Sequence, residues 1–208
     1  MKKTYWNQAL KIASGEMPKY EQELCVLDTE VGDGDHGVTI ARGFRSVAED
    51  PMLNEEMEPN AFCEQFANTL SANMGGAIGP IYGLFWKEMG KALKDCDEIT
   101  SKDIARGMQG AIARIMRVCH VGPGDKTVLD AMLPCAEAMQ NNEMLPISEM
   151  MSKAIEGAEM GRDATRDMVA QKGRARFLFE KTLGHVDAGA SSFTLWMKEW
   201  KKSMDRYA

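Results

Sequence analysis

The sequence predicts an all-α protein built as a bundle of seven or eight helices, with residues 1–208 forming a single domain. Apolar residues recur at helical spacing in several long segments, and alternating β-branched runs long enough for strands do not occur. Four glycine-rich stretches interrupt the helical pattern, as short connections between packed helices do. A chain of 208 residues is long enough to bury one substantial core without dividing into two domains.

Individual segments support this fold class. Phe62, Phe66 and Leu70 are four residues apart, which places them on one face of a helix. Two further one-face sets predict helices, the first made of Ile104, Met108, Ile112, Ile115 and Cys119, the second of Phe193, Trp196, Met197 and Trp200. Thr100, followed three residues later by Asp103, is typical of a helix cap. A long helical stretch is expected from Pro146 to about Gln171.

Composition and charge narrow the function. The net charge of −6 makes nucleic acid an unexpected partner, because a nucleic-acid-binding surface is normally basic. No apolar run approaches the roughly 20 residues that cross a bilayer, so we expect no membrane association. The first residues lack the apolar core of a signal peptide, and the five scattered cysteines form no disulfide or zinc pattern. These features predict a cytoplasmic protein with reduced thiols. The 17 methionines are best explained by adaptable packing in a helical core.

The glycine-rich stretches span residues 31–37, 74–83, 121–127 and 184–189. They can gather at one end of the bundle if alternate connections lie on the same side. The stretch at 75–80 precedes a helix whose free amides would attract phosphate, although no P-loop lysine follows it. In the third stretch Asp125 or Thr127 is expected to cap a helix, and Lys126 to be either a phosphate ligand or an exposed lysine.

The most informative segment runs from Leu27 to Gly37 and contains three aspartates. Gly32 and Gly34 favour a turning loop over a continuous helix, and such a loop can bring Asp28, Asp33 and Asp35 to one point. Three carboxylates that close repel each other unless a cation lies among them, and oxygen ligands suit Mg²⁺ or Ca²⁺.

Two other interpretations of this loop are a calcium site and an acidic turn exposed to solvent. A helix–loop–helix calcium site counted from Asp33 would need glycine at Val38 and glutamate at Phe44, so that motif is excluded. A solvated acidic turn that caps the next helix stays open on these residues alone. His36 adds a polar group beside the aspartates, but its position does not by itself indicate a catalytic base.

Five motifs together resemble the nucleotide-binding L subunit of bacterial dihydroxyacetone kinases, which is also the C-terminal domain of the single-chain kinases. They are Gly-Asp-Gly-Asp-His-Gly at 32–37, Gly-Gly-Ala-Ile-Gly-Pro at 75–80, Pro-Gly-Asp-Lys-Thr-Val-Leu-Asp at 123–130, Ala-Gln-Lys-Gly-Arg-Ala at 170–175 and Gly-His-Val-Asp-Ala-Gly-Ala at 184–190. The resemblance extends from about Trp6 to Trp200.

The resemblance implies an antiparallel eight-helix barrel with a nucleotide site at one end. It implies that two Mg²⁺ ions lie on Asp28, Asp33 and Asp35 and that ADP or ATP is the bound nucleotide. The nucleotide contacts that it implies are His36, Gly37, Val38, Thr39, Ala77, Ile78, Cys119, Val128, Arg174, Asp187, Ala188 and Gly189. We expect Arg174 to be the catalytic residue.

The same resemblance implies partners. A separate K subunit would hold the ketose, and a phosphohistidine protein of the phosphotransferase system would recharge ADP in place. A homodimer is also expected. The chain departs from the family pattern at Thr39, Ile78, Phe179, Lys181, Thr182 and Ala188. Lys181 keeps the charge of the usual arginine but loses its bidentate geometry.

Two functions of other classes remain open at this point. The chain could be a non-catalytic ADP/ATP-sensing partner of a transcription factor, which the departures at Ile78 and Lys181 would permit. A stand-alone Mg²⁺-dependent phosphatase is disfavoured because no Asp-x-Asp nucleophile follows a strand.

Overall fold

The computed structural model describes residues 1–96 and 98–207, and within them the only β-structure is an isolated bridge between Lys2 and Glu98. The α-helices are α1 (Lys3–Glu16), α2 (Glu21–Thr29), α3 (His36–Glu49), α4 (Pro59–Asn73), α5 (Ile78–Ala92), α6 (Ser101–Cys119), α7 (Val128–Asn141), α8 (Ile147–Ala164) and α9 (Ala188–Met204). The 3₁₀ helices are η1 (Met17–Tyr20), η2 (Thr165–Asp167), η3 (Ala175–Thr182) and η4 (Asp205–Tyr207). The all-α prediction is confirmed.

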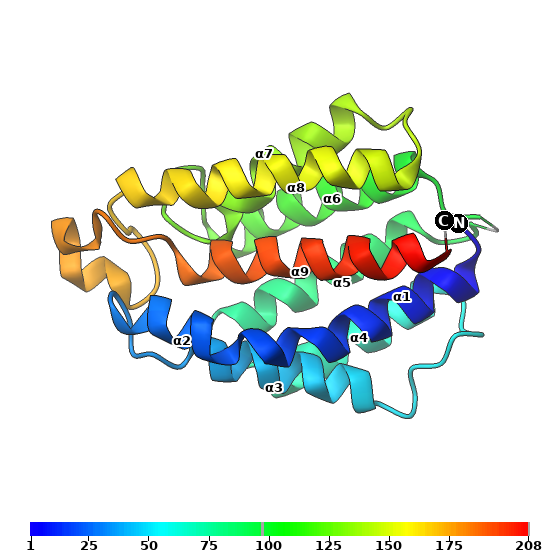
Figure 1. The fold of residues 1–208 in the computed structure, drawn as a ribbon, viewed down its shortest axis with the longest axis horizontal. Coiled ribbons are helices and arrows are strands. Elements are labelled where there is room, and N and C mark those ends of the chain that lie inside the picture. Colours follow the sequence, from blue (N-terminus) through cyan, green and yellow to red (C-terminus); the bar gives the residue numbers. More distant parts are fainter. Residues whose placement is uncertain (97, 208) are drawn as a thin grey trace.

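These helices form eight rods, because α1 and α2 lie end to end along one side of the bundle with η1 between them (Figure 1). Pro18 accounts for the break in this rod, since proline has no N–H to donate and its ring clashes with the preceding turn. Each rod packs on its sequence neighbours, and α9 packs on α1, which closes the ring. The predicted antiparallel eight-helix barrel is therefore present, with one rod in two pieces.

Large aromatic side chains fill the middle of the ring. Trp196 of α9 stacks on Phe44 of α3 with ring centroids 4.5 Å apart, and it meets Trp86 of α5 edge-on at 5.8 Å. Trp200 contacts the same Trp86 at 5.5 Å, and all four of these side chains are fully buried. Such pairs contribute about 0.5–1.5 kcal/mol each beyond their burial. Rods from opposite sides of the ring are thus held in register, which fixes the positions of their ends.

Methionines also pack in this core, in agreement with the explanation of their number given by the sequence. Ten are buried, namely Met17, Met74, Met89, Met108, Met132, Met139, Met150, Met151, Met197 and Met204. The five cysteines are free thiols, in agreement with the sequence prediction.

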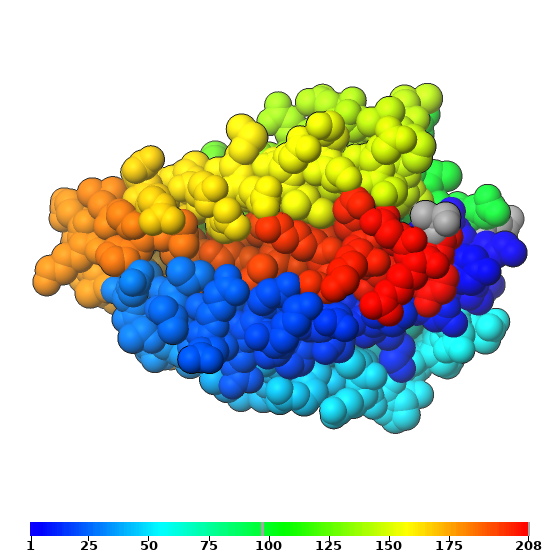
Figure 2. Space-filling view, in the orientation of Figure 1, coloured from blue at the N-terminus to red at the C-terminus, as the bar shows by residue number. Residues whose placement is uncertain are grey.

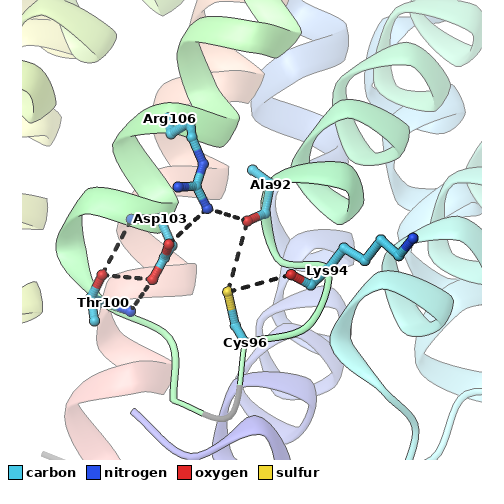
Figure 3. Close-up of polar contacts among 6 residues, drawn as sticks. All are labelled: Ala92, Lys94, Cys96, Thr100, Asp103 and Arg106. Carbon is cyan, nitrogen blue, oxygen red and sulfur yellow. Dashed lines mark hydrogen bonds and ion pairs between the residues drawn. The ribbon is translucent and has the colours of Figure 1, made fainter.

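The predicted cap at Thr100 is confirmed as a capping box, in which Thr100 and Asp103 each accept the other's backbone N–H (Figure 3). Arg106 donates to Asp103 at 2.8 Å and to the carbonyl of Ala92 at 2.5 Å, which ties the start of α6 to the end of α5. Cys96 lies within hydrogen-bonding reach of the same Ala92 carbonyl, at 3.8 Å. This connection is fixed at the end of the bundle where the termini lie (Figure 1).

The segment predicted to be helical from Pro146 to about Gln171 stops earlier. Helix α8 ends at Ala164 and continues only as the short η2. Thr165 fixes the C-terminal end of α8. Its hydroxyl donates to the Arg162 carbonyl at 2.5 Å and accepts the Asp187 N–H at 2.9 Å. The chain beyond it turns across the end of the bundle. Within the described residues, no helix combines the length and apolarity needed to cross a bilayer.

Candidate functional site

A cavity of about 510 Å³ opens at one end of the bundle, and all four glycine-rich stretches contribute to its wall. The expectation that these stretches gather at one end is confirmed. The lining residues are Asp28, Val31, Gly32, Asp33, Asp35, His36, Thr39, Gly75, Gly76, Ala77, Ile78, Pro80, Ile81, Cys119, Val121, Lys126, Thr127, Val128, Lys172, Gly173, Arg174, Ala175, Asp187, Ala188 and Gly189. Ten of the twelve nucleotide contacts expected from sequence, and all three metal aspartates, are among them.

Four helices begin at this cavity. Because neighbouring rods are antiparallel, α3, α5, α7 and α9 all start at the same end, and their first residues line the cavity at His36, Ile78, Val128 and Ala188. Each helix N-terminus carries a partial positive charge and unpaired backbone N–H groups. No side chain caps α5, so its first-turn amides are available to a ligand. The arrangement favours an anion with several oxygens.

The three aspartates of the loop between α2 and α3 converge. A carboxylate oxygen from each of Asp28, Asp33 and Asp35 lies within 4.8 Å of the others, as the sequence predicted. Two glycines permit this turn: a Cβ at Gly32 would lie only 2.2 Å from an Asp28 oxygen, and Gly34 has φ of +76°. Asp28 also accepts the backbone N–H of His36 at 3.2 Å, which orients its carboxylate.

These carboxylates fit a divalent cation. Their hard oxygen atoms suit Mg²⁺, which usually retains coordination positions for water and phosphate oxygens. In this structure the Arg174 guanidinium forms an ion pair with Asp33, so a side chain from the far side of the cavity mouth reaches the acidic loop. A phosphate bound beside the aspartates would therefore lie within reach of Arg174.

His36 is a neutral polar group in the wall of the cavity. Its Nε2 atom is 2.9 Å from the Ser192 hydroxyl, which in turn donates to the Gly189 carbonyl at 3.0 Å. Burial lowers the pKa of His36 to about 4, although the negative charge of Asp28 acts in the opposite direction. Since the Ser192 proton is used, His36 donates from Nε2 to Ser192. The residue is positioned by α9 and is uncharged at neutral pH.

Asp187 is the N-cap of α9, and its carboxylate accepts the backbone N–H of Ala190 at 2.7 Å. The pKa of Asp187 is raised to about 7, chiefly by burial and also by the negative charges of Asp130 and Asp28, although the Ala190 N–H and Lys126 act in the opposite direction. The cavity wall thus contains an acid whose charge is disfavoured until a positive group comes near. A bound cation beside Asp28 would reduce that penalty.

Two of the expected nucleotide contacts do not line the cavity. Gly37 packs α3 against α2, where a Cβ would lie 2.0 Å from the Glu21 carbonyl oxygen. Val38, the next residue, is 45 % exposed on the outer side of the helix. Their part in nucleotide binding remains a prediction that rests on the resemblance alone.

Several lining residues were not singled out from sequence. Ile81 follows Ile78 one turn along α5, and Val31 and Val121 are the first residues of two glycine-rich stretches, so the apolar residues within those stretches were the available signal. Lys126 is buried, and its ammonium donates to four backbone carbonyls, which excludes both the exposed lysine and the phosphate ligand that the sequence suggested. Of the two expected caps, Thr127 forms the capping box of α7, with Asp130.

A family model described as the DAK2 domain matches residues 30–202, which is most of the chain. The chain belongs to the DAK2 domain family. A curated relative from Listeria innocua, "PEP-dependent dihydroxyacetone kinase 2, ADP-binding subunit DhaL", is 30% identical over 92% of this chain and 90% of its own length. The corresponding Escherichia coli subunit is 30% identical over 88% of this chain and 89% of its own length.

Other DAK2 relatives are longer. An L-erythrulose kinase of Pectobacterium atrosepticum is 32% identical over 83% of this chain, which corresponds to 30% of that kinase. Among solved structures, the dihydroxyacetone kinase of C. freundii superposes with a TM-score of 0.75 and 21% identity, covering 95% of this chain and 34% of that one. The same kinase in complex with AMP-PNP and Mg²⁺ gives a TM-score of 0.72 at 22% identity. These structures share the fold of the DAK2 domain described here.

Proposed function

We propose that this DAK2 chain is the nucleotide-binding subunit of a kinase for dihydroxyacetone or a related small ketose. The observation that carries the proposal is the cavity in which three carboxylates face the N-termini of four helices. Carboxylates attract a divalent cation and helix N-termini attract phosphate, so the combination suits a Mg²⁺-bound diphosphate or triphosphate. Residues 1–208 then act as one nucleotide-binding domain.

In this proposal Asp28, Asp33 and Asp35 hold two Mg²⁺ ions, and the phosphates lie against the first turns of α3 and α5. Bound Mg²⁺ would neutralise the charge that develops during phosphoryl transfer. The nucleoside lies toward the apolar part of the wall. Ile81 of α5, Cys119 at the end of α6 and Val121 in the connection between α6 and α7 supply this part. Gly37, Val38 and the other residues expected from the family complete the contacts.

Arg174 is the proposed catalytic residue. Its ion pair with Asp33 indicates that the guanidinium reaches the acidic side of the cavity, and its side chain is 69% exposed at the mouth. There it can stabilise negative charge on the transferred phosphoryl group, as arginine does in other phosphoryl-transfer enzymes. A ketose hydroxyl oxygen would form a bond to the γ-phosphorus while the bond between that phosphorus and the β–γ bridging oxygen breaks. The bonding electron pair would leave with ADP, and the hydroxyl proton would be released to solvent.

We further propose that the ketose is held by a separate K subunit and that bound ADP is recharged in place by a phosphohistidine protein of the phosphotransferase system. Support comes from the relatives of matching length, which are named ADP-binding subunits of PEP-dependent kinases. The erythrulose kinases among the relatives indicate that the substrate class is a short ketose.

The test is a binding and turnover experiment with the purified chain. Calorimetry is expected to show ADP binding that requires Mg²⁺ and disappears with EDTA. Phosphorylation of dihydroxyacetone or erythrulose is expected only after a ketose-binding subunit is added. Absence of ADP binding in the presence of Mg²⁺ would overturn the proposal. Tight Mg²⁺-ADP binding with no ketose phosphorylated by any tested subunit would instead favour a regulatory partner of a transcription factor.

A further inference from the structure

The segment between α8 and α9, residues 165–187, crosses the cavity end of the bundle and carries Arg174. We call it the arginine loop. It contains η2 and η3 but no α-helix, and Figure 2 shows it in orange as the outer surface at this end of the molecule, beside the end of α2. A loop of this kind needs an anchor if Arg174 is to stay at one place relative to the aspartates.

Lys126 provides an anchor at the base of the loop. Its ammonium donates to the carbonyls of Thr165 at 2.7 Å and Met168 at 3.2 Å on the outgoing limb. It also donates to the carbonyls of Thr182 at 2.7 Å and His185 at 2.6 Å on the returning limb. A single side chain from the turn before α7 therefore joins both limbs of the arginine loop.

This position is costly for a lysine. The side chain is almost completely buried, and burial lowers the pKa of Lys126 even though Asp187 acts in the opposite direction. Its backbone has φ of +58°, a left-handed conformation that is strained for a residue with a side chain. Buried charge and backbone strain persist only where the surroundings impose them, and both are commonly found at functional sites.

Other hydrogen bonds brace the same junction. The N–H of Gln171 donates to the Asp125 carbonyl at 3.0 Å, so the turn that carries Lys126 is itself paired with the loop. The Thr182 hydroxyl accepts the Ala170 N–H at 3.0 Å, and Gly184 donates to the Arg166 carbonyl at 2.8 Å. The limbs are thus closed immediately below the part of the loop that carries Gly173 and Arg174.

We propose that Lys126 is a positioning residue. The four hydrogen bonds of its ammonium, which we call the clasp, join the two limbs of the arginine loop and so hold Arg174 beside Asp28, Asp33 and Asp35. The inference rests on the proposed function, because it concerns how that site is assembled. The ammonium has three protons and four carbonyl acceptors, so it has no proton left for a phosphate. Lys126 acts on the nucleotide only through the loop that it closes.

The decisive variant is Lys126→Met, which keeps the length of the side chain and removes its charge and donors. Calorimetry with Mg²⁺ and ADP is expected to show a Kd raised on the order of tenfold, because the loop would be closed in only a fraction of the molecules. Hydrogen exchange is expected to accelerate in residues 168–187 while the core helices stay protected. A purely structural role would lower the melting temperature and leave both quantities unchanged in the folded protein.

Two controls separate the clasp from simple loss of charge. Lys153→Met removes an exposed lysine of α8 that pairs with Glu156, and it should leave the Kd for Mg²⁺-ADP unaltered. Lys172→Met removes a positive charge from the cavity wall, together with its 3.8 Å ion pair to Asp125, but leaves all four hydrogen bonds of the Lys126 ammonium in place. It should therefore raise the Kd only about two- to threefold, as expected for a partly screened charge. A Lys126→Met effect no larger than that of Lys172→Met would overturn the proposal.

A double-mutant cycle tests the link to Arg174. Arg174→Met should weaken Mg²⁺-ADP binding or turnover much less in the Lys126→Met protein than in the wild type; additive effects would overturn the proposal. If Lys126→Met does not fold, Lys126→Gln, which keeps two donors, takes its place in every measurement. Failure of both variants to fold would also count against a positioning role. If wild-type protein does not bind Mg²⁺-ADP, the proposed function fails, whereas the exchange experiment still tests the clasp.

Discussion

The two ends of the bundle treat acidic side chains in opposite ways. At the end where the termini lie, Asp50 in the connection between α3 and α4 has its own donors. It accepts the Thr69 hydroxyl at 2.6 Å, the Gln65 amide at 2.9 Å and the Met52 N–H at 2.8 Å. At the cavity end, Asp33 and Asp35 are exposed and converge with Asp28, with few donors from the protein. The fold satisfies Asp50 with three internal donors. Asp28 and Asp33 have the His36 N–H and Arg174 as partners, and both converge with Asp35 at the cavity, where a ligand can reach them.

The two ends of the bundle also differ in backbone conformation, because most residues with positive φ lie at the cavity end. Within the described residues, all five glycines with positive φ lie in connections around the cavity, at Gly34, Gly76, Gly124, Gly173 and Gly184. Of the non-glycine residues with positive φ, His120, Lys126 and Phe179 lie at the cavity end and only Asp95 lies at the other. Unusual backbone geometry collects where the loops must approach a ligand, and the opposite end is closed by ordinary caps.

The largest effect is expected for Asp35→Asn. This change keeps a good helix-capping residue before α3 but removes one carboxylate from the cation site. The Kd for ADP in the presence of Mg²⁺ should rise on the order of a hundredfold, since loss of a metal-site partner commonly costs that much. Isothermal calorimetry measures it, with thermal unfolding of the apo protein as the check on folding.

Asp50→Asn is the matched variant at the other end, and it should leave Mg²⁺-ADP binding unchanged. If Asp35→Asn binds as well as wild type, or if Asp50→Asn loses binding equally, the contrast between the two ends is wrong.

Asp50→Asn should instead reduce stability, by about 1–2 kcal/mol, because its hydrogen bonds to a charged acceptor are weakened. Burial alone would raise the pKa of Asp50, but hydrogen bonds from Thr69, Gln65 and Met52 and the charge of Lys11 lower it overall. A pKa that is lower in the folded state stabilises the protein above the unfolded value, near 3.8, and this contribution disappears as the pH falls through the folded value.

Thermal unfolding of wild type and Asp50→Asn across pH 3 to 7 measures this contribution. The difference in melting temperature should be largest at neutral pH and should shrink below about pH 4. Glu56→Gln, an exposed acid in the same connection, should show no such difference. A gap between wild type and Asp50→Asn that grows on acidification would contradict the assignment.

The helical bundle and the convergence of the three aspartates could both be predicted from the sequence, for physical reasons. Helical spacing predicted the apolar faces that meet in the ring, and the glycines around Asp33 predicted a turn that brings carboxylates together. Both signals are local. The environment of Lys126 was not predictable in this way, because its four carbonyl partners lie 39 to 59 residues away and backbone carbonyls leave no mark on sequence. The early end of α8 was missed for the same reason, since Thr165 is held by Asp187.

The smallest effect is expected at Phe179, one of the positions at which the chain departs from the pattern that the resemblance implies. Its backbone angles are φ 51° and ψ −131°, which lie outside the regions that residues with a side chain adopt easily, and its ring is 65 % exposed. Phe179→Gly should therefore raise stability by about 1 kcal/mol, because relief of backbone strain exceeds the small loss of packing. Thermal unfolding measures the change, with Phe177→Gly as the control.

Phe177 is a similarly exposed aromatic residue, at 66 %, in the same 3₁₀ segment, but it does not have positive φ. Phe177→Gly should lower stability slightly, since glycine gains more freedom in the unfolded chain than phenylalanine. If Phe179→Gly raises stability and Phe177→Gly lowers it, the strain lies in the backbone at Phe179 itself. If Phe179→Gly is destabilised as much as Phe177→Gly, the backbone at Phe179 is not strained, and the contrast between the ends rests on the carboxylates and on the other residues with positive φ.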